Sequence, residues 1–397
     1  MPPSRAAVVY DCLFPFTTGG GERQYRAFAE ALEQRGISTD YLTATQWETD
    51  RTPEADFRVV PVTGRLRLYD AEGVRRSSAA ASFAWGVFRA LRRRRTAYDL
   101  VIVSGLPVLN VFAARAALWG SSTALVVDYL EVWGRRQWVA YAGPLTGTIA
   151  WALQRAAIAL TPTASCHSAL SATRLRREGY RGALLQSPGL IDERSVAGTT
   201  EARPAADPPF VLYVGRHIAD KRVDSLPAAV AVARRSIPDL RLVILGEGAT
   251  TPDVRGAIAA ADGEQWSELR GFVPQSELQD LLGDAVCLVN PSRREGYGLV
   301  VVEAAAHGTP VVLVADEGNA ATELIEPGTN GFVAASTDPA MLGEALTRAV
   351  HGGDDLRRTT RGWYREAVKT RTIARTVDNI VAATTDGGTV RPSRKRK

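Results

Sequence analysis

The chain has few of the residues that build disulfide frameworks or metal sites. Its 397 residues contain three cysteines, Cys12, Cys166 and Cys287, with no C-x-x-C pair among them. An odd number of widely spaced cysteines argues against a disulfide framework and against a structural zinc site, and it fits a reducing cytosol. The four histidines show no spacing typical of metal ligands. We therefore expect a cytoplasmic protein.

A long uncharged apolar run is also missing. No stretch of about 18 uncharged apolar residues occurs, and even Gly147–Leu160 is interrupted by Gln154 and Arg155. The apolar run Ala6–Tyr10 near the N-terminus is too short for a signal peptide and is typical of a first β-strand. The sequence therefore predicts a protein that does not span a membrane.

Positive charge is concentrated in two runs. The formal net charge is +5, Arg92–Arg95 is an unbroken basic run, and the chain ends with the basic run Arg394–Lys397. Such runs indicate attraction to an anionic lipid surface or an acidic acceptor, or they are a solvated helix end and a frayed tail. The sequence leaves both interpretations open, peripheral contact with an anionic membrane included.

The length and the pattern of apolar runs indicate two α/β domains. A chain of this length exceeds one ordinary core, so two domains of roughly 150–200 residues are expected. Short apolar runs alternate with longer helical patterns, which is typical of parallel βαβ units. The segment Gly198–Pro209 holds three prolines and no apolar periodicity, so it is the predicted linker. In such an architecture the ligand site lies between the domains, outside the carboxyl ends of the strands.

The expected elements follow from this alternation. The predicted strands are Ala6–Tyr10, Phe57–Val62, Leu100–Val103, Thr123–Val127, Ala157–Leu160, Phe210–Val214, Leu240–Leu245, Ala285–Val289 and Pro310–Val314. A helix is predicted over Glu22–Arg35 and ends at Gly36. The expected domains cover residues 1–200 and 208–362, followed by a last helix over 363–384 that packs back on the first domain and a disordered basic tail over 385–397.

The segment Glu295-Gly-Tyr-Gly-Leu-Val-Val-Val-Glu303 is the most specific signal. Gly296 and Gly298 leave room for the phosphates of a ligand at a helix N-terminus, which carries partial positive charge. Glu303 stands among apolar residues and needs a partner, which is either a ribose diol or a buried basic residue with a purely structural role. Eight residues of helix span about 12 Å, so Glu295 can reach a hexose while Glu303 holds the ribose.

A second signal follows the predicted strand Phe210–Val214. The strand runs into Gly215 and Arg216, and Lys221 comes five residues after Arg216. Two cations at the sheet edge would stabilise a departing nucleoside diphosphate, which gains negative charge as the glycosidic bond breaks. The alternative is a surface pair that anchors the start of a helix.

These motifs resemble a known family. Glu295 and Glu303 resemble the E-x7-E motif of retaining glycosyltransferases, and Arg216 with Lys221 resembles the diphosphate-binding pair of glycosyltransferase family 4, which has a GT-B fold. The match continues through Leu245–Gly248, Gly271–Pro274, Asn290–Ser292 and Asn330–Phe332 in the usual order of the family. The resemblance implies two Rossmann-like domains facing across a cleft, with Arg216, Lys221 and Glu295 as catalytic residues. The residues that it implies for donor binding are Gly20, Gly21, Gly215, Phe272, Val273, Gly296, Tyr297, Gly298, Leu299 and Glu303.

The first domain carries weaker signals. Gly20 and Gly21 precede the first helix, where main-chain N–H groups can meet a phosphate or an acceptor, and they resemble the glycine-rich loop of the family. Asp128 and Glu131 follow a strand and are candidates for acceptor binding, with helix capping as the alternative. In many relatives a histidine near this point contacts the donor sugar, but this chain has none there, and Leu130 occupies the nearest position.

The resemblance implies a retaining hexosyltransferase that needs no metal or other cofactor. Its expected partners are a nucleotide-diphosphate sugar donor and a small-molecule, glycan or lipid-linked acceptor, with no role for nucleic acid. A nucleotide-sugar epimerase of the same fold and a non-catalytic nucleotide-sugar-binding protein remain alternatives. A dinucleotide-dependent dehydrogenase is disfavoured, because Gly19–Gly21 does not stand at the tip of the first strand or complete G-x-G-x-x-G.

Overall fold

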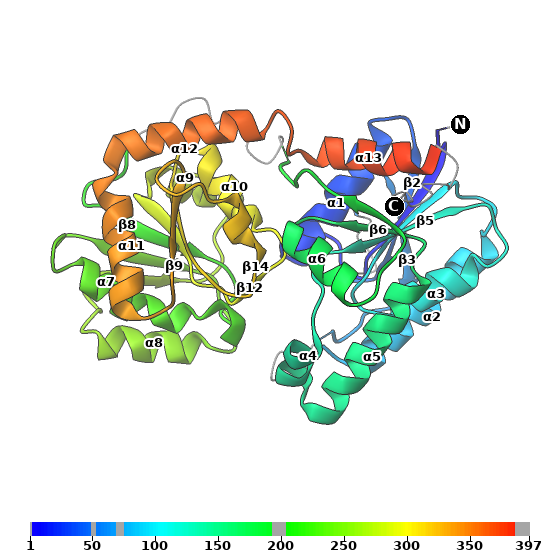
Figure 1. The fold of residues 1–397 in the computed structure, drawn as a ribbon, viewed down its shortest axis with the longest axis horizontal. Helices are drawn as coiled ribbons and strands as arrows, with labels where there is room; N and C mark the ends of the chain where they lie inside the picture. The colour runs from blue at the N-terminus through cyan, green and yellow to red at the C-terminus, as the bar shows by residue number, and fades with distance from the viewer. Residues whose placement is uncertain (1, 49–52, 69–74, 193–203, 386–397) are drawn as a thin grey trace, which may run out of the picture. The chain divides into compact units, whose positions relative to one another are not determined.

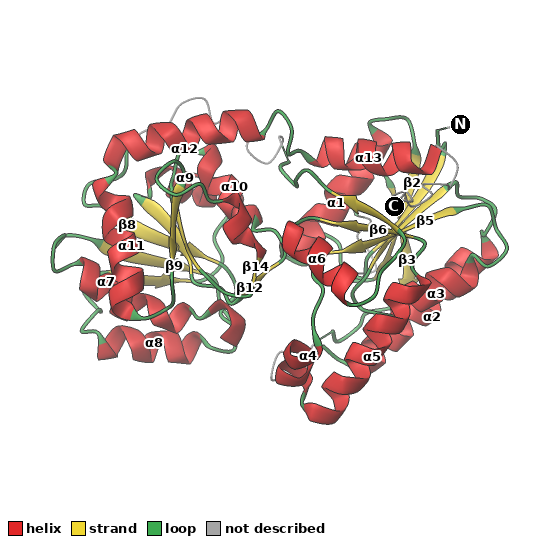
Figure 2. Cartoon of the chain, viewed as in Figure 1, coloured by secondary structure: helices red, strands yellow, loops and turns green. Residues whose placement is uncertain are grey.

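The computed structural model describes residues 2–48, 53–68, 75–192 and 204–385. The chain folds into two compact units, one formed by residues 1–190 together with 371–397 and the other by residues 191–370. We call them the first and the second unit. Each is a parallel sheet with helices on both faces, as Figures 1 and 2 show. The α/β class with two Rossmann-like domains is therefore confirmed.

The sheet of the first unit has seven parallel strands in the order β3-β2-β1-β4-β5-β6-β7. The strands are β1 (Arg5–Val9), β2 (Ser38–Ala44), β3 (Arg58–Thr63), β4 (Leu100–Ser104), β5 (Ala124–Tyr129), β6 (Thr163–Cys166) and β7 (Ala183–Gln186). The helices are α1 (Gly20–Glu33), α2 (Ser77–Arg93), α3 (Leu109–Ala117), α4 (Arg135–Ala142), α5 (Pro144–Leu160), α6 (Ala169–Arg177) and α13 (Ile373–Thr385).

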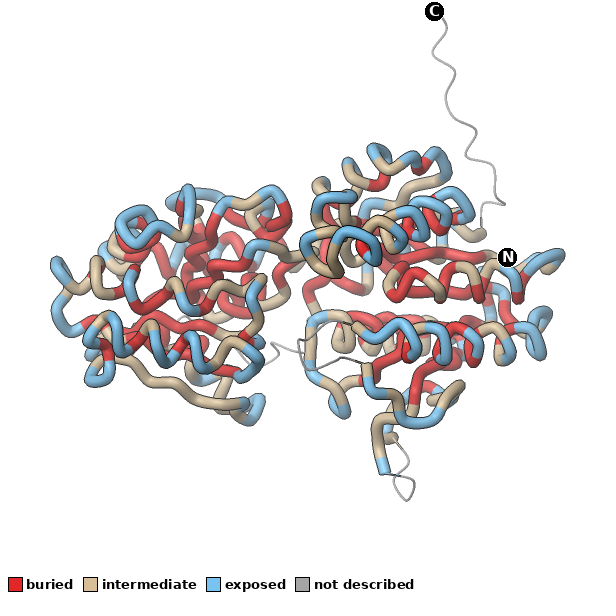
Figure 3. The backbone as a smooth tube through the Cα atoms, turned by 90° about the horizontal axis from the view of Figure 1, so that it is seen from below, coloured by how far each residue is buried: buried red, intermediate tan, exposed pale blue. Residues whose placement is uncertain are grey.

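Helices α2, α3 and α5 cover one face of this sheet. A single buried cluster joins residues from their inner sides, such as Val87, Ala114 and Ile158, to Val101 and Val127 of the central strands. Neighbouring helices in this layer pack on each other, α2 on α3 and α3 on α5 (Figure 1). Their outward sides are exposed, whereas the strands between the helix layers are buried (Figure 3).

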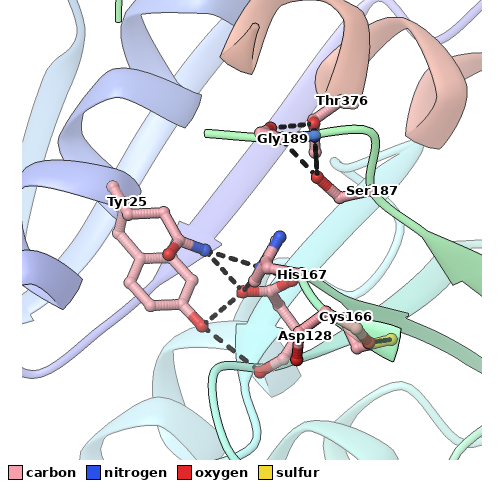
Figure 4. Close-up of polar contacts among 9 residues, drawn as sticks. Tyr25, Asp128, Cys166, His167, Ser187, Gly189 and Thr376 are labelled. Atoms are coloured by element: carbon pink, nitrogen blue, oxygen red, sulfur yellow. Dashed lines mark hydrogen bonds and ion pairs between the residues drawn. The ribbon is translucent and has the colours of Figure 1, made fainter. Parts of the chain in front are cut away.

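Helices α1 and α13 pack on each other in the same unit. Arg35, just after α1, donates through Nε to Asp378 Oδ1 at 2.7 Å and through Nη2 to the Ala374 carbonyl at 2.7 Å. Thr376 Oγ1 lies 2.7 Å from Ser187 Oγ and donates to the Gly189 carbonyl at 2.6 Å (Figure 4). The C-terminal helix is thereby fixed to the first unit at two places.

The sheet of the second unit has six parallel strands in the order β10-β9-β8-β11-β13-β15. Its strands are β8 (Phe210–Val214), β9 (Arg241–Leu245), β10 (Ser267–Arg270), β11 (Cys287–Asn290), β13 (Val311–Val314) and β15 (Gly331–Ala334), and a separate pair is formed by β12 (Arg294–Glu295) and β14 (Gly318–Asn319). The helices are α7 (Leu226–Ala233), α8 (Thr251–Ala260), α9 (Gln275–Asp284), α10 (Leu299–Ala306), α11 (Pro339–His351) and α12 (Gly353–Ala367).

Two element predictions are wrong, and strands β2, β6, β7, β10, β12, β14 and β15 were not predicted. Ala157–Leu160 is the last turn of α5 and not a strand, because Ala157 and Ile158 are buried while their neighbours on both sides are exposed, which is a helical and not an alternating pattern. Strand β2 was not predicted, because Ser, Thr and Asp in it disguise a buried strand whose Asp40 is paired with Arg58. The expected single helix over 363–384 is interrupted after Ala367, and Thr372 Oγ1 accepts from the Arg375 N–H at the start of α13.

Two further predictions fall partly or wholly on residues outside the described ranges. The linker over Gly198–Pro209 overlaps residues 193–203, and the basic tail overlaps residues 386–397. Within the described ranges, no helix combines the length and the apolar composition needed to cross a bilayer.

Candidate functional site

The candidate site of the second unit lies where its strand order changes direction. From β8 the chain builds β9 and β10 on one side of the sheet, and it then returns to build β11, β13 and β15 on the other side. In open parallel sheets, ligands bind outside the carboxyl ends of the two strands at such a point. Here these are β8, which leads into Gly215, and β11, which ends at Asn290.

A short 3₁₀ turn after β8, η1 (Ala219–Lys221), is fastened to the segment that follows β11. The side chain of Asp220 pairs with Arg294, and its carbonyl accepts from the Arg293 N–H at 2.7 Å. Arg222 donates through Nε to the Pro291 carbonyl at 2.8 Å. These contacts hold the loops of the two central strands together.

Lys221 and Glu295 form an ion pair at this junction, with Lys221 Nζ donating to Glu295 Oε1. Asn290 Nδ2 donates to the same carboxylate oxygen at 3.0 Å. Burial alone would raise the pKa of Glu295, but the Lys221 ammonium and hydrogen bonds from Asn290 and Ser292 outweigh it and hold that pKa below its ordinary value. Glu295 is therefore a carboxylate, and Lys221 supplies a fixed positive charge beside it.

Arg216 lies at the same edge and is exposed. Tyr213, near the end of β8, donates through its hydroxyl to the Arg216 carbonyl at 3.2 Å. Burial raises the pKa of Tyr213, the charge of Glu295 raises it further and the charge of Arg216 lowers it. Arg216 follows shortly after β8, and Lys221 in the same loop pairs with Glu295, so the three residues lie at one edge of the sheet.

Glycines let the β9 loop approach the β8 loop closely. Gly246 has φ +114°, and a Cβ there would lie 2.0 Å from the Gly215 carbonyl oxygen. A Cβ on Gly248 would lie 2.2 Å from the His217 carbonyl oxygen. Main-chain hydrogen bonds use this proximity, from the His217 N–H to the Glu247 carbonyl at 3.0 Å and from Thr250 back to His217 at 3.0 Å. The glycines of the Leu245–Gly248 motif therefore allow the close backbone packing around Arg216.

A cavity of about 660 Å³ opens beside this loop, at the carboxyl ends of β9 and β10. Its lining is mainly polar, with Glu247, Thr251, Arg255 and Arg270 among the lining residues. Gly271, which also lines it, immediately precedes Phe272 and Val273. The predicted donor-binding residues Phe272 and Val273 therefore come next in the sequence after a residue that lines the cavity.

The helix of the E-x7-E segment starts later than its first glutamate. Glu295 belongs to β12, and α10 begins only at Leu299, with Gly298 as its N-cap at φ +97°. A Cβ on Gly298 would also lie 2.6 Å from Ala321 Cβ. Glu303 lies within α10 and is 7% exposed, and Tyr297 is also buried. The expected glycine turn and helix are thus present, but only part of the segment is helical.

In the first unit, Gly20 and Gly21 are the first two residues of α1 and not a separate loop. Gly19 is the N-cap and offers no side-chain acceptor, so the first N–H groups of the helix have no partner within it. A Cβ on Gly21 would lie 3.3 Å from Leu130 Cδ1. Leu130 therefore lies beside the start of this helix, at the position where a histidine was expected from the family pattern.

Asp128 is enclosed in the first unit and does not present its carboxylate to an acceptor. Its exposure is 0%, and Oδ2 accepts from Gln24 Nε2 at 2.9 Å and from the Tyr25 hydroxyl at 2.9 Å. His167 Nε2 lies 2.8 Å from Asp128 Oδ1. Figure 4 shows these contacts converging on the carboxylate from α1 and from the end of β6. The prediction of direct acceptor binding by Asp128 does not fit this geometry, because the carboxylate is used internally.

The partners of Asp128 were missed in the sequence. Gln24 and Tyr25 come from the first turns of α1, and His167 follows β6 directly. The adjacent strands β5 and β6 pair Tyr129 with Cys166, which places Asp128 and His167 at the same sheet edge. That adjacency was the available signal, but it requires knowing that β6 is Thr163–Cys166.

Glu131, the other acceptor candidate, accepts a hydrogen bond through Oε2 from Trp133 Nε1 at 2.7 Å. Trp133 packs on Trp138 with ring centroids 4.8 Å apart and on Tyr141 at 5.1 Å. Glu131 is partly exposed. It thus orients an aromatic cluster at the start of α4, and its role toward an acceptor stays a prediction.

Two family models match the chain. Residues 200–364 match the model "Glycosyl transferases group 1", and residues 19–186 match "Glycosyl transferase 4-like domain". The α-D-kanosaminyltransferase of Streptomyces kanamyceticus is 32% identical over 172 residues, 43% of this chain and 44% of that protein. The D-inositol 3-phosphate glycosyltransferase of Frankia alni is 35% identical over 153 residues, 36% of this chain and 37% of that protein. The matched region thus spans less than half of each of these relatives.

Solved structures show the same fold across nearly the whole chain. Sucrose-phosphate synthase from Thermosynechococcus elongatus superimposes with a TM-score of 0.76 at 18% identity, covering 96% of this chain and 98% of that one. HepE of Anabaena in complex with UDP-glucose superimposes with a TM-score of 0.67 at 14% identity, covering 96% and 99%. Together with the two family models, these likenesses show that the chain belongs to the GT-B glycosyltransferases related to family 4.

Proposed function

We propose that this protein is a retaining glycosyltransferase that moves a hexose from a nucleotide-diphosphate donor to a hydroxyl group of a small-molecule, glycan or lipid-linked acceptor. The observation that carries the proposal is the gathering of Arg216, Lys221 and Glu295 at the switch point between β8 and β11. Two cations beside an ionised carboxylate suit a ligand with an anionic diphosphate and a hydroxyl-rich sugar.

Each group has a defined part in the proposed reaction. The diphosphate of the donor displaces Glu295 from Lys221 and binds Lys221 and Arg216. Glu295, released from the ion pair, accepts hydrogen bonds from sugar hydroxyls. Glu303 on α10 binds the ribose diol, and the cavity beside Gly271 takes the base. The family relationship and the polar lining of that cavity support this division.

The proposed transfer reaction needs no basic residue of the protein. The bond between the anomeric carbon and the diphosphate oxygen breaks, and the diphosphate leaves with the electron pair while positive charge develops on the sugar ring. The acceptor hydroxyl attacks from the side on which the diphosphate leaves, and its proton passes to a diphosphate oxygen. Arg216 and Lys221 stabilise the negative charge of the leaving group more in the transition state than in the ground state.

The donor part of the proposal is tested by thermal unfolding with nucleotides. A ligand that binds only the folded state raises the melting temperature. We expect one nucleoside diphosphate, and its sugar conjugates, to raise it more than the corresponding monophosphate, and Arg216→Ala to reduce this difference. A panel in which no nucleotide shifts the melting temperature would contradict donor binding.

The transfer step is tested separately by product analysis. Incubation with the preferred donor and a set of acceptors is expected to yield a glycoside with the anomeric configuration of the donor, assigned by NMR. An inverted product would contradict retention, and an epimerised donor without any glycoside would identify an epimerase. We further propose that the reaction needs no metal, since Arg216 and Lys221 supply the positive charge, so turnover in excess EDTA should equal turnover without it. Lost activity restored by Mg²⁺ would contradict this.

A further inference from the structure

The outer side of the α2, α3 and α5 layer exposes large apolar side chains. Within the described residues, six of the nine exposed large hydrophobic side chains lie on or directly after these three helices. They are Trp85, Trp119, Leu145, Ile149, Leu153 and Leu160. Together with Arg89, Arg92 and Arg93 of α2, these residues form what we call the α2–α5 surface. Trp119 is 73% exposed and Leu145 is 75% exposed. Such a concentration on one face of a unit marks an interaction site.

The apolar residues of α5 form a continuous stripe. Leu145, Ile149 and Leu153 are four residues apart, and at 100° per residue Leu160 falls between Ile149 and Leu153 around the helix axis. Ala156 is exposed within the same arc, and the exposed Ala152 lies about 20° outside it. The inward side of the helix is already used, since Ala157 and Ile158 are buried against the sheet. The stripe is therefore a second apolar face, in addition to the one that the fold needs.

This surface carries positive charge with almost no negative charge. Helices α2, α3, α4 and α5 contain no aspartate or glutamate. Residues 75–160 hold eleven arginines and three acidic residues. Of these acidic residues, Asp128 is buried and Asp99 accepts hydrogen bonds from Ser4. Arg89, Arg92 and Arg93 are exposed, and none forms an ion pair within the part of the chain that the structure describes.

The arginine end of this surface lies away from the site edge of the same unit. In a βαβ unit the helix runs antiparallel to the strands, so the C-terminal ends of α2 and α3 lie where the strands begin. Arg92 and Arg93 end α2, and Trp119 follows α3. Gly20 and Asp128 lie at the opposite edge, where the strands end. A partner bound at the arginine end would leave the first turn of α1 uncovered.

We propose that the α2–α5 surface docks on an anionic lipid bilayer. Helices that bind at a membrane interface combine exposed leucine, isoleucine and tryptophan with arginine, as this surface does. Their apolar side chains enter the headgroup region, and their arginines bind anionic lipids. A second copy of the chain fits poorly, because a twofold interface would bring arginines against arginines. A nucleic acid would use the arginines and leave the α5 stripe in water. The inference is independent of glycosyl transfer.

The test is sedimentation of the full chain with vesicles of phosphatidylcholine alone or with one quarter phosphatidylglycerol. We expect binding to the anionic vesicles only, weakened by salt. Arg89→Gln/Arg92→Gln/Arg93→Gln should reduce the partition coefficient roughly 100-fold, about 5-fold per arginine. Ile149→Gln/Leu153→Gln should reduce it about 10-fold or more. All five side chains are exposed, so the melting temperature should stay unchanged.

Matched controls keep the proposal falsifiable. Arg181→Gln/Arg235→Gln/Arg365→Gln removes equal charge from exposed positions elsewhere and should bind like the wild type. Glutamine in place of the four basic residues 394–397 should retain most of the binding. The proposal is overturned if wild type binds neutral vesicles equally, if only the 394–397 variant loses binding, or if the α2 and α5 variants bind normally. Sedimentation velocity completes the test: a dimer that dissociates in Ile149→Gln/Leu153→Gln would assign this surface to a second copy instead.

Discussion

Lys221 and Glu295 are joined in an ion pair that links the turn after β8 to the strand β12. The pair keeps a carboxylate ionised in a site where burial would favour its neutral form. Each partner also fixes the position of the other, since both side chains come from short irregular segments. Two of the three predicted catalytic residues therefore hold each other in place.

The acid dependence of stability should change in Glu295→Gln. The pKa of Glu295 is lowered below its ordinary value of 4.5, so its stabilising contribution is complete above that pH and is lost as the pH falls through the lower, folded-state pKa. At pH 7 the variant should lose about 1.5–3 kcal/mol, the usual value for hydrogen bonds to a charged group. Thermal unfolding of wild type and variant from pH 7 to pH 3 measures the difference, which should shrink toward acid.

Asp40 and Asp99 do not account for a pH-dependent difference between wild type and Glu295→Gln. The pKa values of Asp40 and Asp99 are also lowered, but both residues are unchanged in the variant and their contributions cancel in the comparison. A difference that stays constant over the whole pH range would mean that the charge of Glu295 contributes nothing to stability.

Gly246→Ala should disturb the site through the backbone. The new Cβ would meet the Gly215 carbonyl, and the φ of +114° is strained for alanine, so a loss of at least 1–3 kcal/mol is expected. Gly256→Ala is the matched control, because nothing lies within 4 Å of its added Cβ in α8 and alanine there should stabilise the protein by about 0.5–1 kcal/mol. Melting temperatures that move in the same direction in both variants would contradict this account.

Asp128→Asn should act on stability and not on acceptor affinity. The substitution weakens the hydrogen bonds that Asp128 accepts from Gln24 and Tyr25 and its contact with His167, at an expected loss of about 1–3 kcal/mol. Because the side chain is enclosed, the KM for the acceptor should change less than twofold at temperatures where the variant is folded. A large rise in this KM together with an unchanged melting temperature would restore Asp128 as an acceptor-binding residue.

Sequence patterns predicted four of the six strands in the sheet of the second unit and missed β10 and β15. Phe210–Val214 is a strand with the predicted bounds, and the strands before Gly246 and Pro291 lie within a few residues of their predicted positions. All are continuous apolar runs bounded by glycine, proline or asparagine, so local pattern and tertiary burial agree.

The first unit was harder to predict because local patterns there conflict with tertiary packing. The polar side chains of β2 have hydrogen-bond partners distant in sequence; for example, Arg58 and the Tyr98 hydroxyl donate to the Asp40 carboxylate. The alanine-rich end of α5 fits a helix and a strand equally well as a short apolar run. The use of Asp128 as a buried acceptor depends on α1 and β6, which no local pattern relates to it.

The central claim is that Arg216 and Lys221 stabilise the departing nucleoside diphosphate, and kcat measures it most directly. With the preferred donor and acceptor, Arg216→Ala and Lys221→Ala should each lower kcat by about 100- to 1,000-fold, as loss of one transition-state donor does. Arg235→Ala, an exposed arginine elsewhere in the second unit, should match wild type. Wild-type turnover in both site variants, with each still folded by its melting temperature, would contradict the account.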